Sequence, residues 1–174
     1  MNNNIEVLKE ILNKDSKNSK IWIKLGIAYF QKRECKKAIA AYKEALAIEP
    51  NEALNWHNLG YIYNEIDQFN NAIEALKEAI NLNPKMAITW TELSSAYLEK
   101  GDFNNAIEAC KHALELDTKD ESAWTNLGSA YYNNKNYDQA IIAFNKALDL
   151  IPNLEFAKKI LQLAENAKKE EESE

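Results

Sequence analysis

The sequence is poor in the residues that build loops, because its 174 residues include only four glycines and three prolines. Such a chain has little capacity for the glycine-rich turns that bind phosphates, and it contains no GxSxG, P-loop or HExxH motif. Sustained β-branched alternation is missing, as is any apolar run close to the roughly 18 residues of a membrane-spanning helix. We therefore expect a mostly helical, soluble protein that is not an enzyme, does not insert into membranes and uses no cofactor or metal.

The charge balance excludes a second group of functions. Lysine and arginine number 21 against 27 acidic residues, which gives a formal net charge of −6. This balance lacks the basic footprint of proteins that bind nucleic acid or an anionic membrane surface. The opening MNNNIEVLKEILNK also lacks the basic and apolar segments of a secretory signal. We expect a cytoplasmic protein without a nucleic-acid partner.

The four tryptophans mark a repeat. Trp22, Trp56, Trp90 and Trp124 are evenly spaced along the chain, and their period of about 34 residues is typical of a helical solenoid. They open the segments WIKLGIAY, WHNLGYIY, WTELSSAY and WTNLGSAY. Within a segment, the Trp, Leu, Gly and Tyr positions have the i, i+3, i+4, i+7 spacing that places side chains on one face of a helix.

A second amphipathic helix is predicted in the other half of every repeat. Its small residues are Ala38, Ala72, Ala106 and Ala140, then Ala45, Ala79, Ala113 and Ala147. Between them stand the larger or softer residues Tyr42, Leu76, Cys110 and Phe144. Small residues opposite Trp and Tyr allow two antiparallel helices to approach closely and pack at native density. Proline ends three of the repeats, at Pro50, Pro84 and Pro152, and Thr118 takes that place in the third.

These residues resemble the tetratricopeptide repeat (TPR) family, whose pattern W-x2-L-G-x2-Y, A-x3-F, A and P is matched four times in tandem. The resemblance implies an all-α fold, a right-handed superhelical solenoid of antiparallel helix pairs. We expect the repeats at residues 19–52, 53–86, 87–120 and 121–154. Ser94 replaces the glycine that the family prefers, and the usual Gly-Asp turn occurs only as Gly101-Asp102.

Both flanks continue the pattern. Residues 1–18 are predicted to hold the second helix of an incomplete leading repeat, with an apolar stripe of Ile5, Leu8, Ile11 and Leu12. Residues 155–174 are predicted to form a capping helix followed by an acidic tail, AKKEEESE, that frays in solvent. The stripe of the capping helix is Phe156, Ala157, Ile160, Leu161 and Ala164. A solenoid needs such ends because its last complete repeat otherwise exposes its stacking face.

The cysteines and histidines give no catalytic or metal-binding set. Cys35 and Cys110 are two repeats apart, more than about 15 Å, which exceeds the reach of a disulfide, so we expect two reduced, buried thiols. His112 faces away from the apolar stripe of its helix and is predicted to be solvated. His57 projects away from the Trp stripe, where contact with a ligand is plausible, but no nucleophile or acid partner for catalysis is identifiable.

The side of each first helix opposite the Trp stripe is unusually apolar. It comprises the positions two before each Trp and one, five, eight and nine after it, which are polar in an ordinary amphipathic helix. The TPR resemblance implies that these faces line a concave groove in which family members bind peptides. The candidate peptide-binding residues are Lys20, Ile23, Ile27, Phe30, Leu54, His57, Tyr61, Asn64, Ile88, Thr91, Ser95, Leu98, Thr125, Ser129 and Tyr132. The alternative is that Ile23, Ile27 and Phe30 are covered by the leading helix or exposed singly.

The carboxylate clamp of some TPR proteins is missing. Members that bind the C-terminal carboxylate of chaperones resemble one another in presenting Lys and Asn in one repeat and further cations two repeats later. The corresponding positions here hold Ile23, Ile27, Ile88 and Glu92. Shifting the frame by one repeat places His57 and Tyr61 in the first pair, and Glu65 and Glu99 would repel an anionic terminus. A partner with apolar anchors, and a Lys or Arg, suits the groove better.

Two functions therefore remain open. The first is a non-enzymatic scaffold or adaptor that binds a peptide segment of a protein partner in the concave groove. The second is a self-assembling, homo-oligomeric scaffold that uses its solenoid ends or its groove, because incomplete repeats at an end favour stacking.

Overall fold

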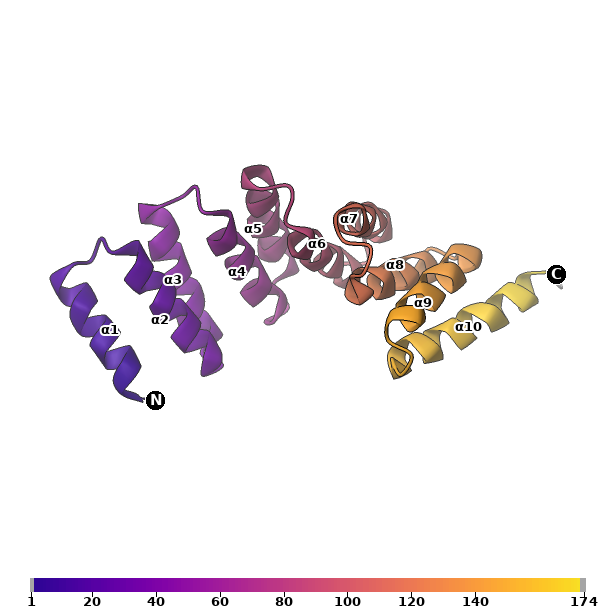
Figure 1. Ribbon diagram of the computed structural model, residues 1–174, viewed down its shortest axis with the longest axis horizontal. Helices are drawn as coiled ribbons and strands as arrows, with labels where there is room; N and C mark the ends of the chain where they lie inside the picture. Colours follow the sequence, from indigo (N-terminus) through magenta and orange to yellow (C-terminus); the bar gives the residue numbers. More distant parts are fainter. Residues whose placement is uncertain (1, 173–174) are drawn as a thin grey trace. The chain divides into compact units, whose positions relative to one another are not determined.

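The computed structural model describes the backbone of residues 2–172 and the side chains of residues 5–172. Met1 and residues 173–174 of the predicted leading and tail segments lie outside the described residues. The described chain contains ten α-helices and no strand, and it divides into two compact units, Met1–Pro84 and Lys85–Glu174 (Figure 1). The first unit holds α1 (Asn2–Lys14), α2 (Ser19–Gln31), α3 (Cys35–Ile48), α4 (Ala53–Asn64) and α5 (Phe69–Leu82). The second holds α6 (Ala87–Glu99), α7 (Phe103–Leu116), α8 (Glu121–Asn133), α9 (Tyr137–Leu150) and α10 (Glu155–Glu171).

The helices keep the period of the sequence. The first helices of the four pairs, α2, α4, α6 and α8, begin at the same regular interval that separates the tryptophans, and so do the second helices α3, α5, α7 and α9. Within each unit, consecutive helices pack against one another. The chain is therefore an all-α solenoid of helix pairs, as the sequence predicts.

A left-handed residue joins the two helices of every pair. Its φ is 60° at Arg33, 59° at Asp67, 74° at Gly101 and 59° at Lys135. The following amide then reaches back to close the helix, as when Glu34 N–H donates to the carbonyl of Tyr29 at 2.9 Å. Only one of the four positions is glycine, so three turns hold an ordinary side chain in a conformation that glycine adopts more readily.

Close contact between small and large residues holds each pair together. The alanines that open and close the stripe of the second helices are fully buried, Ala72 and Ala79 among them at 0% exposure. A Cβ atom added at Gly60 would lie 2.6 Å from Cγ of Leu76, and one at Gly128 would lie 2.9 Å from the ring of Phe144. The two helices therefore approach as closely as the sequence pattern predicts.

The tryptophans are half-buried rather than sealed in the core. The indole N–H of Trp22 donates to the carbonyl of Ser16 at 2.8 Å, that of Trp56 to Pro50 at 2.7 Å, and that of Trp124 to Thr118 at 3.0 Å. Each acceptor lies six residues earlier, in the turn before the helix. Because the acceptor is a backbone carbonyl, Ser16 and Thr118 can fill the role that Pro50 has for Trp56.

The two terminal helices depart from the predicted stripes. On α1, Ile5, Leu8 and Leu12 are buried, but Ile11 is 37% exposed. On α10, Ala157 and Ala164 are fully buried, whereas Phe156 is 53% exposed. α1 packs mainly on α2, and α10 packs mainly on α9 with a smaller contact to α8, which leaves part of each wide apolar stripe uncovered.

The predicted acidic tail is helical as far as Glu171, where α10 ends. Nζ of Lys168 donates to Oδ1 of Asp138 at 2.5 Å, which links the last turns of α10 to α9. The ion pair is partly exposed and strengthens the helix end only modestly.

The two cysteines also differ from expectation in one respect. Cys110 is buried, as predicted, but Cys35 is only partly buried at the start of α3. Both are free thiols. No helix within the described part of the chain is long and apolar enough to cross a membrane.

Candidate functional site

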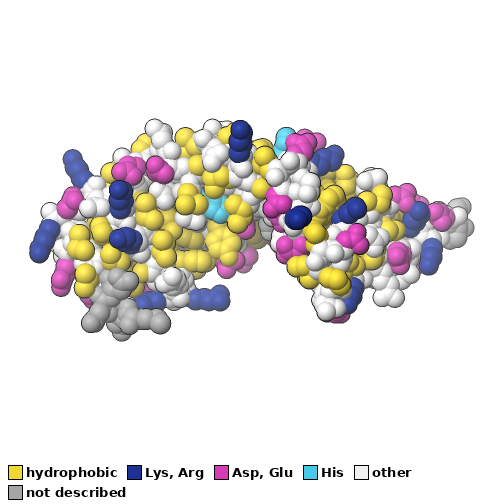
Figure 2. All heavy atoms as spheres, in the orientation of Figure 1, with side chains coloured by type: hydrophobic (Ala, Val, Ile, Leu, Met, Phe, Trp, Pro, Cys, Tyr) yellow, Lys and Arg dark blue, Asp and Glu magenta, His cyan; other side chains and the backbone are white. Residues whose placement is uncertain are grey.

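In the first unit, apolar side chains are exposed along α2 and α4. Ile27 is 42% exposed and Leu54 56% exposed. Phe30 on α2 and Tyr61 on α4 meet edge to face, with ring centroids 5.7 Å apart. Figure 2 shows hydrophobic side chains gathered over this part of the first unit. We call Ile23, Ile27, Phe30, Leu54 and Tyr61 the first-unit patch. Lys20 is exposed on the same helix as Ile23, and Ile23 is half-buried.

Two predicted residues of α4 contribute less to this surface. His57 is only 7% exposed, and its burial lowers its pKa below the ordinary value of 6.5 because the imidazolium is poorly solvated there. Asn64 is half-buried. The helical projection places His57 beside the patch, but the structure encloses its side chain.

In the second unit, α6, α8 and α10 together form a pocket of about 350 Å³. Four predicted residues line it, namely Ser95, Leu98, Ser129 and Tyr132. Sequence reasoning missed Phe156 and Ile160, which α10 contributes to the same wall. The signal was available, because Phe156 precedes Lys158 by two residues and Lys158 occupies the Trp position of a fifth repeat. We call this the second-unit pocket.

Ile88 is the most exposed predicted residue of the second unit, at 56%. Thr91, in contrast, is 6% exposed, and its hydroxyl donates to Oδ2 of Asp120 at 2.6 Å. The side chain of Asp120 also accepts from the amide of Ala123 at the start of α8. Thr91 therefore joins α6 to the beginning of α8 and does not offer its hydroxyl to a partner.

Two of the other predicted hydroxyls donate to backbone carbonyls. Thr125 Oγ1 donates to Glu121 at 2.8 Å, and Ser129 Oγ donates to Thr125 at 2.9 Å. Both side chains are half-buried. What they present outward are oxygen lone pairs, so these two residues are acceptors more than donors.

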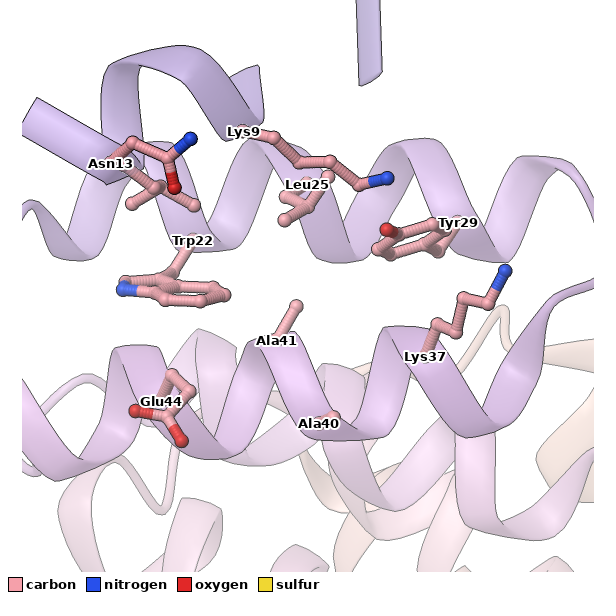
Figure 3. A pocket seen from close by; sticks show the side chains of 10 residues that line it. Lys9, Asn13, Trp22, Leu25, Tyr29, Lys37, Ala40, Ala41 and Glu44 are labelled. Carbon is pink, nitrogen blue, oxygen red and sulfur yellow. The ribbon is translucent and has the colours of Figure 1, made fainter. Parts of the chain in front are cut away.

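A further pocket of about 400 Å³ lies where α1, α2 and α3 meet, shown in Figure 3. Trp22, Leu25 and Tyr29 of α2 form its wall, and Lys9 and Lys37 extend toward Tyr29 from α1 and α3. A second pocket repeats this arrangement one repeat later, lined by Trp56, Leu59 and Tyr63. Because it recurs with the period, we interpret it as the seam between successive repeats. It was not predicted from the sequence.

The remaining polar candidate is His112. His112 is exposed, as predicted, and its ring lies 4.5 Å from that of Trp90 with a tilt of 35°. Within residues 5–172, no three His, Cys, Asp or Glu side chains gather in a geometry that would hold a metal ion. Among the described residues, large apolar side chains are exposed on first helices, at Ile27, Leu54 and Ile88, and also on second helices, as at Leu116 and Ile142.

The fold defines a helical-repeat protein of the kind that serves as a scaffold for protein–protein interaction. A family model described as the cilia and flagella-associated protein 70 C-terminal domain, itself a TPR model, matches residues 2–123. A tetratricopeptide repeat model matches residues 122–154. The chain belongs to the tetratricopeptide repeat family.

Solved structures show the same architecture. MamA, in its crystal structure, is 29% identical in sequence to this chain, with a TM-score of 0.81 over 84% of this chain and 85% of that chain. YrrB, described as a TPR protein with an unusual peptide-binding site, is 21% identical, with a TM-score of 0.83 over 91% of this chain and 81% of its own. The first TPR domain of human RPAP3 is 23% identical, with a TM-score of 0.68 over 71% of this chain and 98% of that domain. The last two show the fold alone. A comparison with curated proteins gave no match.

Proposed function

We propose that this protein is a non-enzymatic adaptor of the cytoplasm that binds a peptide segment of a protein partner on the exposed faces of its first helices. A TPR fold supports a role in protein–protein interaction in general, and the peptide-binding face is our more specific assignment. The observation that carries it is the exposure of large apolar side chains at positions where an amphipathic helix is normally polar, above all Leu54 and Ile88, each 56% exposed.

The physical basis is pre-organisation. Phe30 and Tyr61 hold each other edge to face, so the first-unit patch is ordered before a partner arrives. A rigid surface loses little conformational entropy on binding, and modest apolar contacts then suffice for affinity near the micromolar level, about 8 kcal/mol. A partner with apolar anchors fits this surface, whereas a carboxylate terminus finds no paired cations at Ile23 and Ile27.

The test compares three forms of the full chain in a lysate of the source cells. One is unchanged, one carries Ile27→Glu with Leu54→Glu, and the control carries Ile142→Glu. Ile142 is 51% exposed on α9, a second helix, so it matches the burial of the tested residues on a different face. Proteins bound to each form are identified by mass spectrometry after circular dichroism has confirmed equal helicity.

A protein that binds the unchanged and Ile142→Glu forms but not the double variant supports the proposal. Equal capture by all three forms contradicts it, because the first-unit patch would then not be the working surface.

Self-assembly is a second candidate function, favoured by the exposed face of α1. Val7 and Ile11 are 49% and 37% exposed, although one repeat later the same positions hold Ala41 and Ala45, which are 2% and 0% exposed. In the complete repeats, the first helix of the pair packs over these positions. Sedimentation over a wide concentration range tests this alternative. Association that Val7→Glu with Ile11→Glu abolishes supports it, and a monomer at every concentration contradicts it.

A further inference from the structure

The charged lining of the second-unit pocket is acidic. Among the described residues that line it, Glu99 is the only one with a charge. Glu99 is exposed at the last position of α6, where the carboxylate faces the negative end of the helix dipole. This position gives the carboxylate no stabilising role in its own helix, so it is available to a positive charge.

Three hydrogen-bond donors of the pocket already have acceptors within the protein. An Nδ2 proton of Asn126 is donated to Oγ of Ser94 at 3.0 Å, and one of Asn133 is donated to the carbonyl of Ser129 at 2.8 Å. The hydroxyl of Ser129 is donated within its own helix at 2.9 Å. The amide oxygens of Asn126 and Asn133 and the hydroxyl oxygen of Ser129 remain as acceptors for a group that enters the pocket.

The apolar wall is fixed in place. Tyr132 and Ile160 pack against the buried cluster formed by Ala140, Phe144, Ala157 and Ala164. The ring of Tyr132 also lies 5.9 Å from that of Tyr137. Phe156 stands on the same wall and is 53% exposed. Its aromatic face is therefore available to stack on a flat cation.

We propose that the second-unit pocket binds an arginine or lysine side chain of the partner peptide next to an apolar residue. The apolar residue packs on Leu98, Phe156 and Ile160, and the cation is received by Glu99 and the oxygen acceptors. This inference rests on the proposed peptide-binding function and adds the partner's charge. Arginine fits better than lysine, because a planar guanidinium stacks on an aromatic ring while it donates several hydrogen bonds.

The experiment titrates the full chain with three small probes while amide shifts are followed by NMR. The probes are the acetylated, amidated dipeptides Leu-Arg, Leu-citrulline and Leu-Glu, of which citrulline keeps the shape of arginine without its charge. We expect Leu-Arg to bind about fivefold more tightly than Leu-citrulline, the size of one partly exposed charge-assisted contact. The shifts should map to Leu98, Tyr132 and Phe156.

Variants identify the residues responsible. Glu99→Gln should remove the preference for Leu-Arg, whereas Glu108→Gln, which neutralises an exposed carboxylate on α7, should keep it. Phe156→Ala should weaken both the arginine and citrulline probes, whereas Leu163→Ala, also exposed on α10 but outside the pocket lining, should not. All four positions are exposed, so the variants are expected to fold.

Equal binding of the three probes at the pocket overturns the assignment of a cation. Shifts confined to other surfaces, or no binding at all, overturn the pocket as a site. Neither result affects the outcome of the capture experiment, because that experiment depends on Ile27 and Leu54 in the first unit. Failure of this inference is therefore distinguishable from failure of the proposed function.

Discussion

Ser94 on α6 lies opposite Cys110 on α7, close enough for its hydroxyl to oppose the effect of burial on the pKa of the Cys110 thiol. Both residues are fully buried, at 0% exposure. In the other three pairs the same two positions hold glycine opposite Tyr42, Leu76 or Phe144, with hypothetical Cβ contacts of 2.6–2.9 Å. A larger residue on the first helix is thus matched by a smaller one on the second, and the third repeat keeps its helix spacing by this exchange.

The exchange predicts coupling between the two positions. Cys110→Phe alone should destabilise the second unit by about 1–3 kcal/mol, because the ring meets the Ser94 side chain. Adding Ser94→Gly restores the arrangement of Gly128 and Phe144, so the double variant should be more stable than the sum of the single effects by about 1 kcal/mol or more. Urea unfolding followed by circular dichroism measures all three. Additive effects would show that the positions do not compensate.

The left-handed turn residues are positions at which a substitution by glycine should raise the free energy of unfolding. Lys135 has a φ of 59°, a conformation that costs a non-glycine residue about 1–2 kcal/mol. Lys135→Gly should therefore raise the unfolding free energy by about 0.5–1 kcal/mol, after the extra entropy of glycine in the unfolded chain is subtracted. Lys135→Ala is the control, because it removes the side chain and keeps the strain. Equal midpoints for the glycine and alanine variants would contradict this account of the turn.

The thiols should react at very different rates. Burial raises the pKa of Cys110 to about 12, so at about pH 8 it is almost entirely a buried thiol. Cys35 is partly exposed at the beginning of α3. We expect one fast-reacting thiol with a disulfide reagent in the native protein and a second only after unfolding. Cys35→Ser should remove the fast phase. Two fast thiols in the native protein would show that Cys110 is not enclosed.

Much of the fold was predictable, because the same residue pattern recurs in four successive repeats and each occurrence predicts the same pair of helices. The candidate site was less predictable, since a helical projection treats each helix alone. The helical projection places Thr91 on the outward face of α6, yet its side chain is buried and its hydroxyl is hydrogen-bonded to Asp120 at the beginning of α8. The sequence analysis assigned Phe156 only to the apolar stripe of the capping helix, although the register through Lys158 also places it two residues before a Trp position, as Leu54 and Ile88 are. The left-handed turns at Arg33 and Asp67 carry no glycine to indicate them.

His57 predicts a dependence of stability on pH. Burial lowers the pKa of His57 in the folded state below the value of about 6.5 expected in the unfolded chain. The unfolded chain therefore binds the proton more readily, so the full contribution is present above about pH 6.5 and is lost as the pH falls through the folded-state pKa. Urea midpoints between about pH 7 and pH 5.5 should fall for the unchanged protein and less for His57→Gln. Parallel slopes would exclude His57 as the source.

The most direct test of the central claim is the dissociation constant of a purified partner for three forms of the protein, measured by calorimetry. The forms are the unchanged chain, the Ile27→Glu, Leu54→Glu variant and the Ile142→Glu control. Two buried apolar contacts replaced by carboxylates should weaken binding at least about tenfold in the double variant, while the control keeps its affinity. The same dissociation constant for all three forms would contradict the assignment of the first-helix face as the binding surface.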